Sequence, residues 1–120
     1  MRSIINILDL TVEELDELIA TANDIIANPK KYSEKCRGLK LATCFLSLLR
    51  TRLSFEAAMY ELGGNVLGFS EAQSSSAAKG ESVADTAKTV SCYADIIAMR
   101  HPKEGAPLVA AMNATVPVIN

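Results

Sequence analysis

Stretches with a helical pattern alternate with short apolar runs along the chain, and this alternation is the feature that most restricts its fold. Thr11 and Glu14 form a capping box, and apolar residues then recur every three or four positions as far as Ala27. Further helices are predicted at 53–62, 82–94 and 106–112, and apolar, strand-like runs occur at 39–49, 65–69, 95–99 and 116–119. Such an alternation predicts an α/β fold in which a parallel sheet of about four strands has helices on both faces.

Length and charge narrow the possible functions. The chain has 120 residues, the size of one domain, so residues 1–120 are expected to form a single unit. Its net charge of −2 includes no basic excess, which makes nucleic acid an unfavourable partner. The apolar stretch Leu41–Leu49 is far shorter than the roughly 20 residues that a membrane helix needs. We therefore expect a cytoplasmic protein without a membrane segment or signal peptide.

The three cysteines, Cys36, Cys44 and Cys92, share no Cys-x-x-Cys spacing. With one histidine and no paired ligand spacing, a disulfide framework and a metal site are both disfavoured. The thiols are predicted to be reduced and structural.

Three polar segments are expected at the carboxyl edge of the sheet, where ligands of open parallel sheets bind. Arg50-Thr51-Arg52 directly precedes the predicted second helix and could hold an anion, above all phosphate, although the motif by itself is more typical of a solvated pair of arginines beside a helix start. Lys79 lies in a small-residue loop, which by itself is more typical of an exposed connection. Arg100-His101-Pro102 follows a strand and is either a polar turn or an oxyanion contact. The residues thus allow a phosphate pocket built from Arg50, Thr51, Lys79 and Arg100.

Three ordered motifs add a resemblance to these patterns. Residues 50–69 (RTRLSFEAAMYELGGNVLGF), 79–86 (KGESVADT) and 99–102 (MRHP) closely resemble the aspartate/ornithine carbamoyltransferase family, and the last two favour its aspartate branch. The resemblance implies one half of a two-domain fold, the half that binds carbamoyl phosphate. It also implies the transfer of a carbamoyl group from carbamoyl phosphate to L-aspartate in pyrimidine biosynthesis, without a cofactor.

The resemblance also assigns roles to individual residues. Arg50 and Thr51 would hold the phosphate at the helix N-terminus and Arg100 would contact carbamoyl phosphate, so that these three would form the catalytic and substrate-binding set. Ser75 and Lys79 match the loop that this family inserts into the active site of the adjacent subunit of a homotrimer. The amine of L-aspartate would attack the carbonyl carbon directly, while cationic groups stabilise the oxyanion and the departing phosphate.

The chain departs from the family pattern in two places. The family reads Phe-x-Glu-Pro-Ser-Thr-Arg-Thr-Arg before the helix, whereas here the approach is one residue shorter, and Leu48 and Leu49 replace the serine and threonine. Loss of one base from codons for Phe-Glu-Pro-Ser-Thr would give the Leu-Ser-Leu-Leu of residues 46–49, so a compensated frameshift is one hypothesis; this run could also extend the second helix backwards. The family continues beyond the last strand with an aspartate-binding domain, which this sequence lacks.

These departures leave two further interpretations beside a carbamoyl-phosphate-binding half. The chain alone is expected not to be catalytic, and its last strand is expected to lack a cover. The main alternative is a degenerate, non-catalytic remnant or an assembly module with a disrupted phosphate site. An unrelated flavodoxin-like receiver or nucleotide-binding module is disfavoured by the three motifs.

Overall fold

The computed structural model describes residues 2–45, 49–69 and 82–120 of the chain. The helices and strands follow one another in the alternating order that the sequence predicts. In chain order they are η1 (Ile7–Asp9), α1 (Val12–Ala27), η2 (Pro29–Tyr32), β1 (Lys40–Phe45), α2 (Leu49–Glu61), β2 (Asn65–Phe69), α3 (Val83–Ser91), β3 (Ile96–Arg100), α4 (Ala106–Asn113) and β4 (Val118–Ile119).

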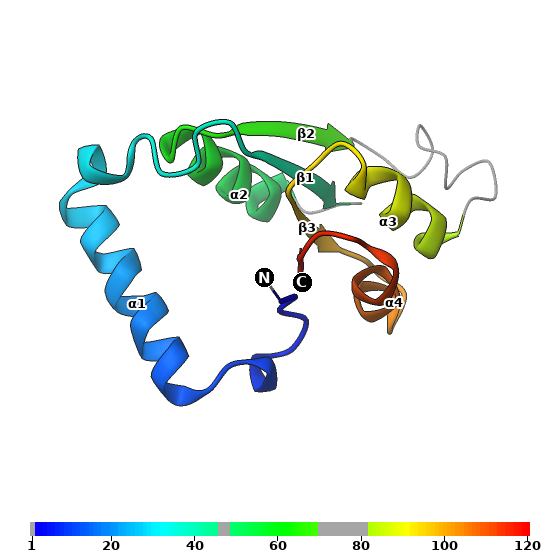
Figure 1. Ribbon diagram of the computed structural model, residues 1–120. Helices are drawn as coiled ribbons and strands as arrows, with labels where there is room; N and C mark the ends of the chain where they lie inside the picture. The colour runs from blue at the N-terminus through cyan, green and yellow to red at the C-terminus, as the bar shows by residue number, and fades with distance from the viewer. Residues whose placement is uncertain (1, 46–48, 70–81) are drawn as a thin grey trace.

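The four strands form one parallel sheet in the order β2-β1-β3-β4 (Figure 1). The central strand β1 pairs with β2 from Lys40 opposite Asn65, and with β3 from Leu41 opposite Ile96. A parallel pairing requires a crossover between successive strands, and helices provide these crossovers. The predicted α/β class and the parallel sheet are confirmed.

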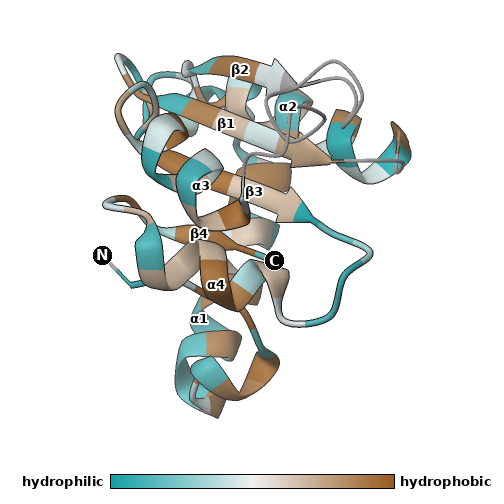
Figure 2. Ribbon diagram, turned by 90° about the vertical axis from the view of Figure 1, so that its right-hand side faces the viewer, coloured by the Kyte–Doolittle hydropathy of each residue, from teal (hydrophilic) through white to brown (hydrophobic). Residues whose placement is uncertain are grey.

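Helices cover both faces of the sheet, as predicted, and each face has its own apolar core. On one face, Met59 of α2 packs with Leu41, Phe45 and Ala98 of the central strands. On the other face, α3 and α4 pack against the remaining strand residues; this cluster consists of Ala42, Ala87, Val90, Ala94, Ile97, Met99, Ala110 and Val118. The central strands are accordingly coloured in brown, hydrophobic tones in Figure 2. This packing holds the carboxyl ends of β1 and β3 side by side.

The outer edge of β4 is covered by the N-terminal segment of the chain, contrary to the expectation that the last strand lacks a cover. Ile4 forms a parallel bridge to Ile119. Its N–H donates to the carbonyl of Val118 at 2.9 Å, and its carbonyl accepts from the N–H of Asn120 at 3.0 Å. Ser3 Oγ accepts a further bond from the N–H of Val118 at 2.9 Å. Figure 1 accordingly shows the two ends of the chain close together.

Helix α1 stands apart from the sheet (Figure 1). The predicted capping box is present, since Thr11 Oγ1 accepts from the N–H of Glu14 and the Glu14 carboxylate accepts from the N–H of Thr11. No residue of α1 is buried, and apolar side chains such as Ile26, 77% exposed, face solvent. The predicted helix over 12–27 is therefore confirmed, but its apolar stripe lies outside both cores.

Several boundaries differ from the sequence prediction. Helix α2 begins at Leu49 rather than at Leu53. The sequence pattern missed the first turn because its residues are exposed and show no apolar periodicity. Strand β1 correspondingly ends at Phe45, so the apolar run 39–49 contains two different elements. The predicted helix over 82–94 ends at Ser91.

The cysteines and the helix lengths complete the comparison. All three thiols are free, but Cys92 is exposed, so the expectation that all three are structural is wrong for that residue. Burial raises the pKa of the half-buried Cys44 to about 11, which makes this thiol unreactive. Within the described residues, no helix combines the length and the apolar character that crossing a membrane requires.

Candidate functional site

The carboxyl edge of β1 and β3 places two of the predicted segments near each other. Phe45, the last residue of β1, is in register with Arg100, the last residue of β3. Helix α2 starts four residues after Phe45 and contains Arg50 and Thr51 in its first turn. The sequence placed these two residues directly ahead of the helix, and the structure corrects this placement by one turn.

The first described turn of α2 lies close to this edge of the sheet. The first four N–H groups of an α-helix have no acceptor within the helix. Arg50 and Thr51 lie in the first described turn of α2, which begins at Leu49, and both residues are exposed. Their exposure, together with the positive end of the helix dipole, is what an anion site requires.

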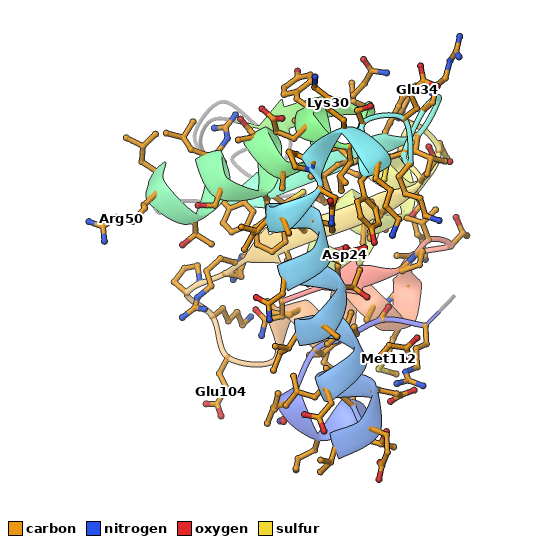
Figure 3. The ribbon with its side chains drawn as sticks, turned by 90° about the vertical axis from the view of Figure 1, so that its left-hand side faces the viewer. Asp24, Lys30, Glu34, Arg50, Glu104 and Met112 are labelled. Atoms are coloured by element: carbon orange, nitrogen blue, oxygen red, sulfur yellow. The ribbon has the colours of Figure 1, made fainter. Side chains whose placement is uncertain are left out.

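The side chain of Arg50 extends away from the end of α2 into solvent (Figure 3). Arg100 is also exposed. Among the residues described, no hydrogen bond or salt bridge joins Arg50, Thr51 and Arg100 to one another. These side chains therefore lie at one edge of the sheet without forming a closed site by themselves.

His101 follows Arg100 and is held in one tautomer. Its Nδ1 accepts a hydrogen bond of 3.0 Å from the N–H of Lys103. In the neutral ring, the proton then resides on Nε2, which is a hydrogen-bond donor. The sequence left open whether this segment is a polar turn or an oxyanion contact; the bond from Lys103 lies within the turn, and Nε2 is the donor that a ligand could meet.

Two predicted residues cannot be placed. Ser75 and Lys79, which the resemblance assigns to an adjacent subunit, lie outside the described residues.

Sequence reasoning missed a polar cluster beneath the first turn of α2. Glu56 accepts hydrogen bonds from Arg52 of the same helix and from Thr43 of β1, and Gly68 of β2 lies against them. Two signals pointed to it: the four-residue spacing of Arg52 and Glu56, and a glycine inside a strand, which often marks a close approach. Neither signal identifies the third partner, since Thr43 comes from a different element.

An apolar cavity of about 350 Å³ lies between α3 and the β1–β2 pair, lined by Ala42, Leu67, Gly68, Thr89, Val90 and Tyr93. None of the predicted site residues lines it. Among the described residues, no group of three or more histidine, cysteine or acidic side chains is arranged to hold a metal ion.

Comparison with known proteins identifies a close sequence relationship. The family model described as "Aspartate/ornithine carbamoyltransferase, carbamoyl-P binding domain" matches residues 2–120. The chain is 64% identical, over 121 aligned positions, to the aspartate carbamoyltransferase catalytic subunit of Lachnoclostridium phytofermentans. The aligned region covers all of this chain and 39% of that protein. It is 58% identical to the corresponding subunit of Clostridium kluyveri, again over 39% of the relative's length.

Solved structures agree with this relationship. The catalytic subunit of M. jannaschii aspartate transcarbamoylase superposes with a TM-score of 0.91 at 44% identity, over all of this chain and 41% of that one. The Trypanosoma cruzi aspartate transcarbamoylase in complex with carbamoyl phosphate gives a TM-score of 0.90 at 32% identity, over 99% of this chain and 39% of that one. The chain thus spans about two fifths of the length of the proteins that it matches.

Proposed function

Because this chain belongs to the aspartate/ornithine carbamoyltransferase family, as its carbamoyl-phosphate-binding domain, we propose that it binds carbamoyl phosphate at the carboxyl edge of its sheet. In this proposal residues 1–120 form the binding unit, with Arg50 and Thr51 on the phosphate and Arg100 on the same ligand. One observation supports it above the others: Arg50 and Thr51 are both exposed in the first described turn of α2, which begins at Leu49, four residues after β1 ends.

The chemistry of these groups suits a phosphate monoester-like dianion. Backbone N–H groups at a helix start and a guanidinium both donate charge-assisted hydrogen bonds to phosphate oxygens. Arg100 is in register with Phe45, the last residue of the strand that precedes α2. Closure of Arg50 and Arg100 onto a ligand would neutralise its two negative charges.

The whole reaction requires more than this domain. We propose that, with an aspartate-binding domain, the site would transfer the carbamoyl group to L-aspartate and release phosphate, as in cytoplasmic pyrimidine biosynthesis. The amine would attack the carbonyl carbon, and Thr51, Arg50 and Arg100 would stabilise the charge that develops there and on the leaving phosphate. Ser75 and Lys79 would complete the site of a neighbouring subunit in a homotrimer. No cofactor is needed for this direct displacement.

A second candidate is a non-catalytic remnant or assembly module, and one observation favours it. Leu49, 71% exposed, occupies the first position of α2, and Leu48 precedes it in the sequence where the family has serine and threonine. Leucine side chains donate no hydrogen bond. Losing two donors to a charged ligand, at about 1.5–3 kcal/mol each, would weaken binding by roughly a hundredfold or more.

Titration calorimetry of the purified chain with carbamoyl phosphate tests the proposal. Arg50→Gln should weaken binding about tenfold or more, whereas the matched control Arg37→Gln, at a 78% exposed side chain away from this edge, should not change it. A third variant replaces residues 46–49 with Phe-Glu-Pro-Ser-Thr. If only this restored chain binds, the second candidate is correct; if neither chain binds, the proposed site is wrong.

A further inference from the structure

The polar cluster under α2 joins the helix to the sheet through one carboxylate oxygen. Glu56 Oε1 accepts a hydrogen bond of 2.7 Å from Thr43 Oγ1 of β1. The same oxygen accepts a bond of 2.7 Å from Arg52 Nε, one helical turn earlier. Thr43 is fully buried, and the Arg52 and Glu56 side chains are only 24% and 17% exposed. We call these three residues the α2 brace.

Gly68 of β2 makes room for the brace. A Cβ atom at this position would lie 2.4 Å from Arg52 Nη2, 3.3 Å from Glu56 Oε1 and 3.4 Å from Thr43 Oγ1. Gly68 is in register with Thr43 on the neighbouring strand. The guanidinium of Arg52 therefore rests on the surface of β2 while its Nε holds Glu56, and the brace connects α2 to both strands.

Electrostatics support a fixed, ionised pair. Burial by itself raises the pKa of Glu56, but the hydrogen bonds from Arg52 and Thr43 outweigh it and hold that pKa below its usual value. The carboxylate thus compensates the charge of the guanidinium. This pairing distinguishes Arg52 from Arg50, which extends into solvent at the end of the helix (Figure 3).

Apolar packing alone holds the start of α2 weakly. Met59, in the last turns, is the buried residue of this helix. Nearer its start, half-buried Phe55 meets Phe45 with ring centroids 5.9 Å apart, and Arg52 is the first residue of α2 that is not exposed. The position of the first turn over the sheet therefore depends largely on the brace.

We propose that Arg52 is a positioning residue, which through Glu56 and Thr43 fixes the first turn of α2 so that the N–H groups of Arg50 and Thr51 point to the anion site. This inference rests on the proposed function. In this scheme Arg52 does not contact the ligand; it acts by fixing the direction of the helix. Because a helix N-terminus stabilises an anion only over its first turn, a small tilt is enough to weaken binding.

Phosphate affinity and stability, measured together, test the proposal. The probe is inorganic phosphate, titrated calorimetrically into the chain. Arg52→Met should weaken phosphate binding at least tenfold. The control Val90→Ala removes buried methyl groups on the opposite face of the sheet, where Val90 is 5% exposed. It should lower the urea midpoint yet leave phosphate affinity within threefold of that of the unchanged chain.

Variants of Glu56 separate positioning from charge. Glu56→Gln keeps an oxygen acceptor for Arg52 and Thr43 and should retain affinity within threefold, whereas Glu56→Leu, of similar shape, should lose it as Arg52→Met does. If Arg52→Met does not fold, Gly68→Ala displaces the guanidinium without shortening it and should also weaken binding. Binding that is unchanged in Arg52→Met or Gly68→Ala, or that falls equally in Val90→Ala, would overturn the proposal.

A ligand-free measurement keeps the two proposals distinguishable. If the unchanged chain binds neither phosphate nor carbamoyl phosphate, the proposed function fails. The backbone amide resonances of Arg50 and Thr51 then test whether the α2 brace positions the first turn of the helix. They should shift in Arg52→Met and stay in place in Val90→Ala; resonances that do not move in Arg52→Met refute the positioning role.

Discussion

Two isoleucines provide a matched test of where the stability of this domain resides. Ile97, in β3, is 2% exposed and pairs with Ala42 on one side and Val118 on the other. Ile26, in α1, is 77% exposed. The same substitution, isoleucine to alanine, removes the same atoms from a closed core in one case and from solvent in the other. The difference between the two variants therefore isolates burial.

The magnitudes follow from that difference. Ile97→Ala should lower the free energy of unfolding by about 2–5 kcal/mol, which corresponds to a fall in Tm of about 8–20 °C for a domain of this size. Ile26→Ala should change it by less than about 0.5 kcal/mol, because alanine also favours a helix by a few tenths of a kcal/mol.

Urea unfolding followed by far-ultraviolet circular dichroism measures both variants. If Ile97→Ala does not fold, Ile97→Val should still cost about 0.5–1.5 kcal/mol. A cost for Ile26→Ala as large as that for Ile97→Ala would show that the apolar face of α1 is buried. That result would refute the assignment of the core to the two faces of the sheet.

Three further predictions concern a cap, a carboxylate and the encoding DNA. Ser82 Oγ accepts from the N–H of Asp85 at 3.1 Å, so Ser82→Ala should cost about 1 kcal/mol in urea unfolding; no loss would contradict the cap. Hydrogen bonds, above all from Lys31, lower the pKa of Asp24 from 3.8 to about 2, so its stabilisation is present above pH 4 and lost as the pH falls towards 2. In Asp24→Asn the urea midpoint should fall less over this pH range than in the unchanged chain, and an equal fall in both chains would refute the stabilising role of Asp24. Sequencing the gene should find codons for residues 46–49 that restore Phe-Glu-Pro-Ser-Thr when one T is inserted near their start and two bases at their end; unrelated codons reject the frameshift.

The spacing of apolar residues predicted the order of the helices and strands because apolar residues recur at the buried positions of each element. The apolar runs that became β1 and β3 lie between two helical layers, and alternation of such runs with helices specifies a parallel sheet. The same reasoning fails where exposure hides a helix. Leu49, Arg50 and Thr51 are exposed, so the first turn of α2 has no apolar stripe, and the sequence placed the helix start at Leu53.

Contacts between distant segments were not predictable from local patterns. Ile4 covers the edge of β4 through backbone hydrogen bonds that any short segment can form, and the hydroxyl of Ser3 adds one more, so no sequence pattern predicts this contact. The brace depends on the register that sets Thr43 beside Gly68, and this register exists only after β1 and β2 pair. The helical spacing of Arg52 and Glu56 alone predicts an exposed ion pair, which contributes little.

In the proposed function, the departure at residues 46–49 would affect phosphate binding. The two cores contain strand and helix residues such as Ala42, Ile97 and Met59, all outside this segment. A TM-score of 0.91 to a solved catalytic subunit is therefore compatible with an altered approach to α2. The proposed phosphate site would be more sensitive to this segment, because its donors would come from the start of α2. The match of the family model to residues 2–120 establishes the family, whereas the affinity for phosphate, compared between the present and the restored approach, measures what the altered residues cost.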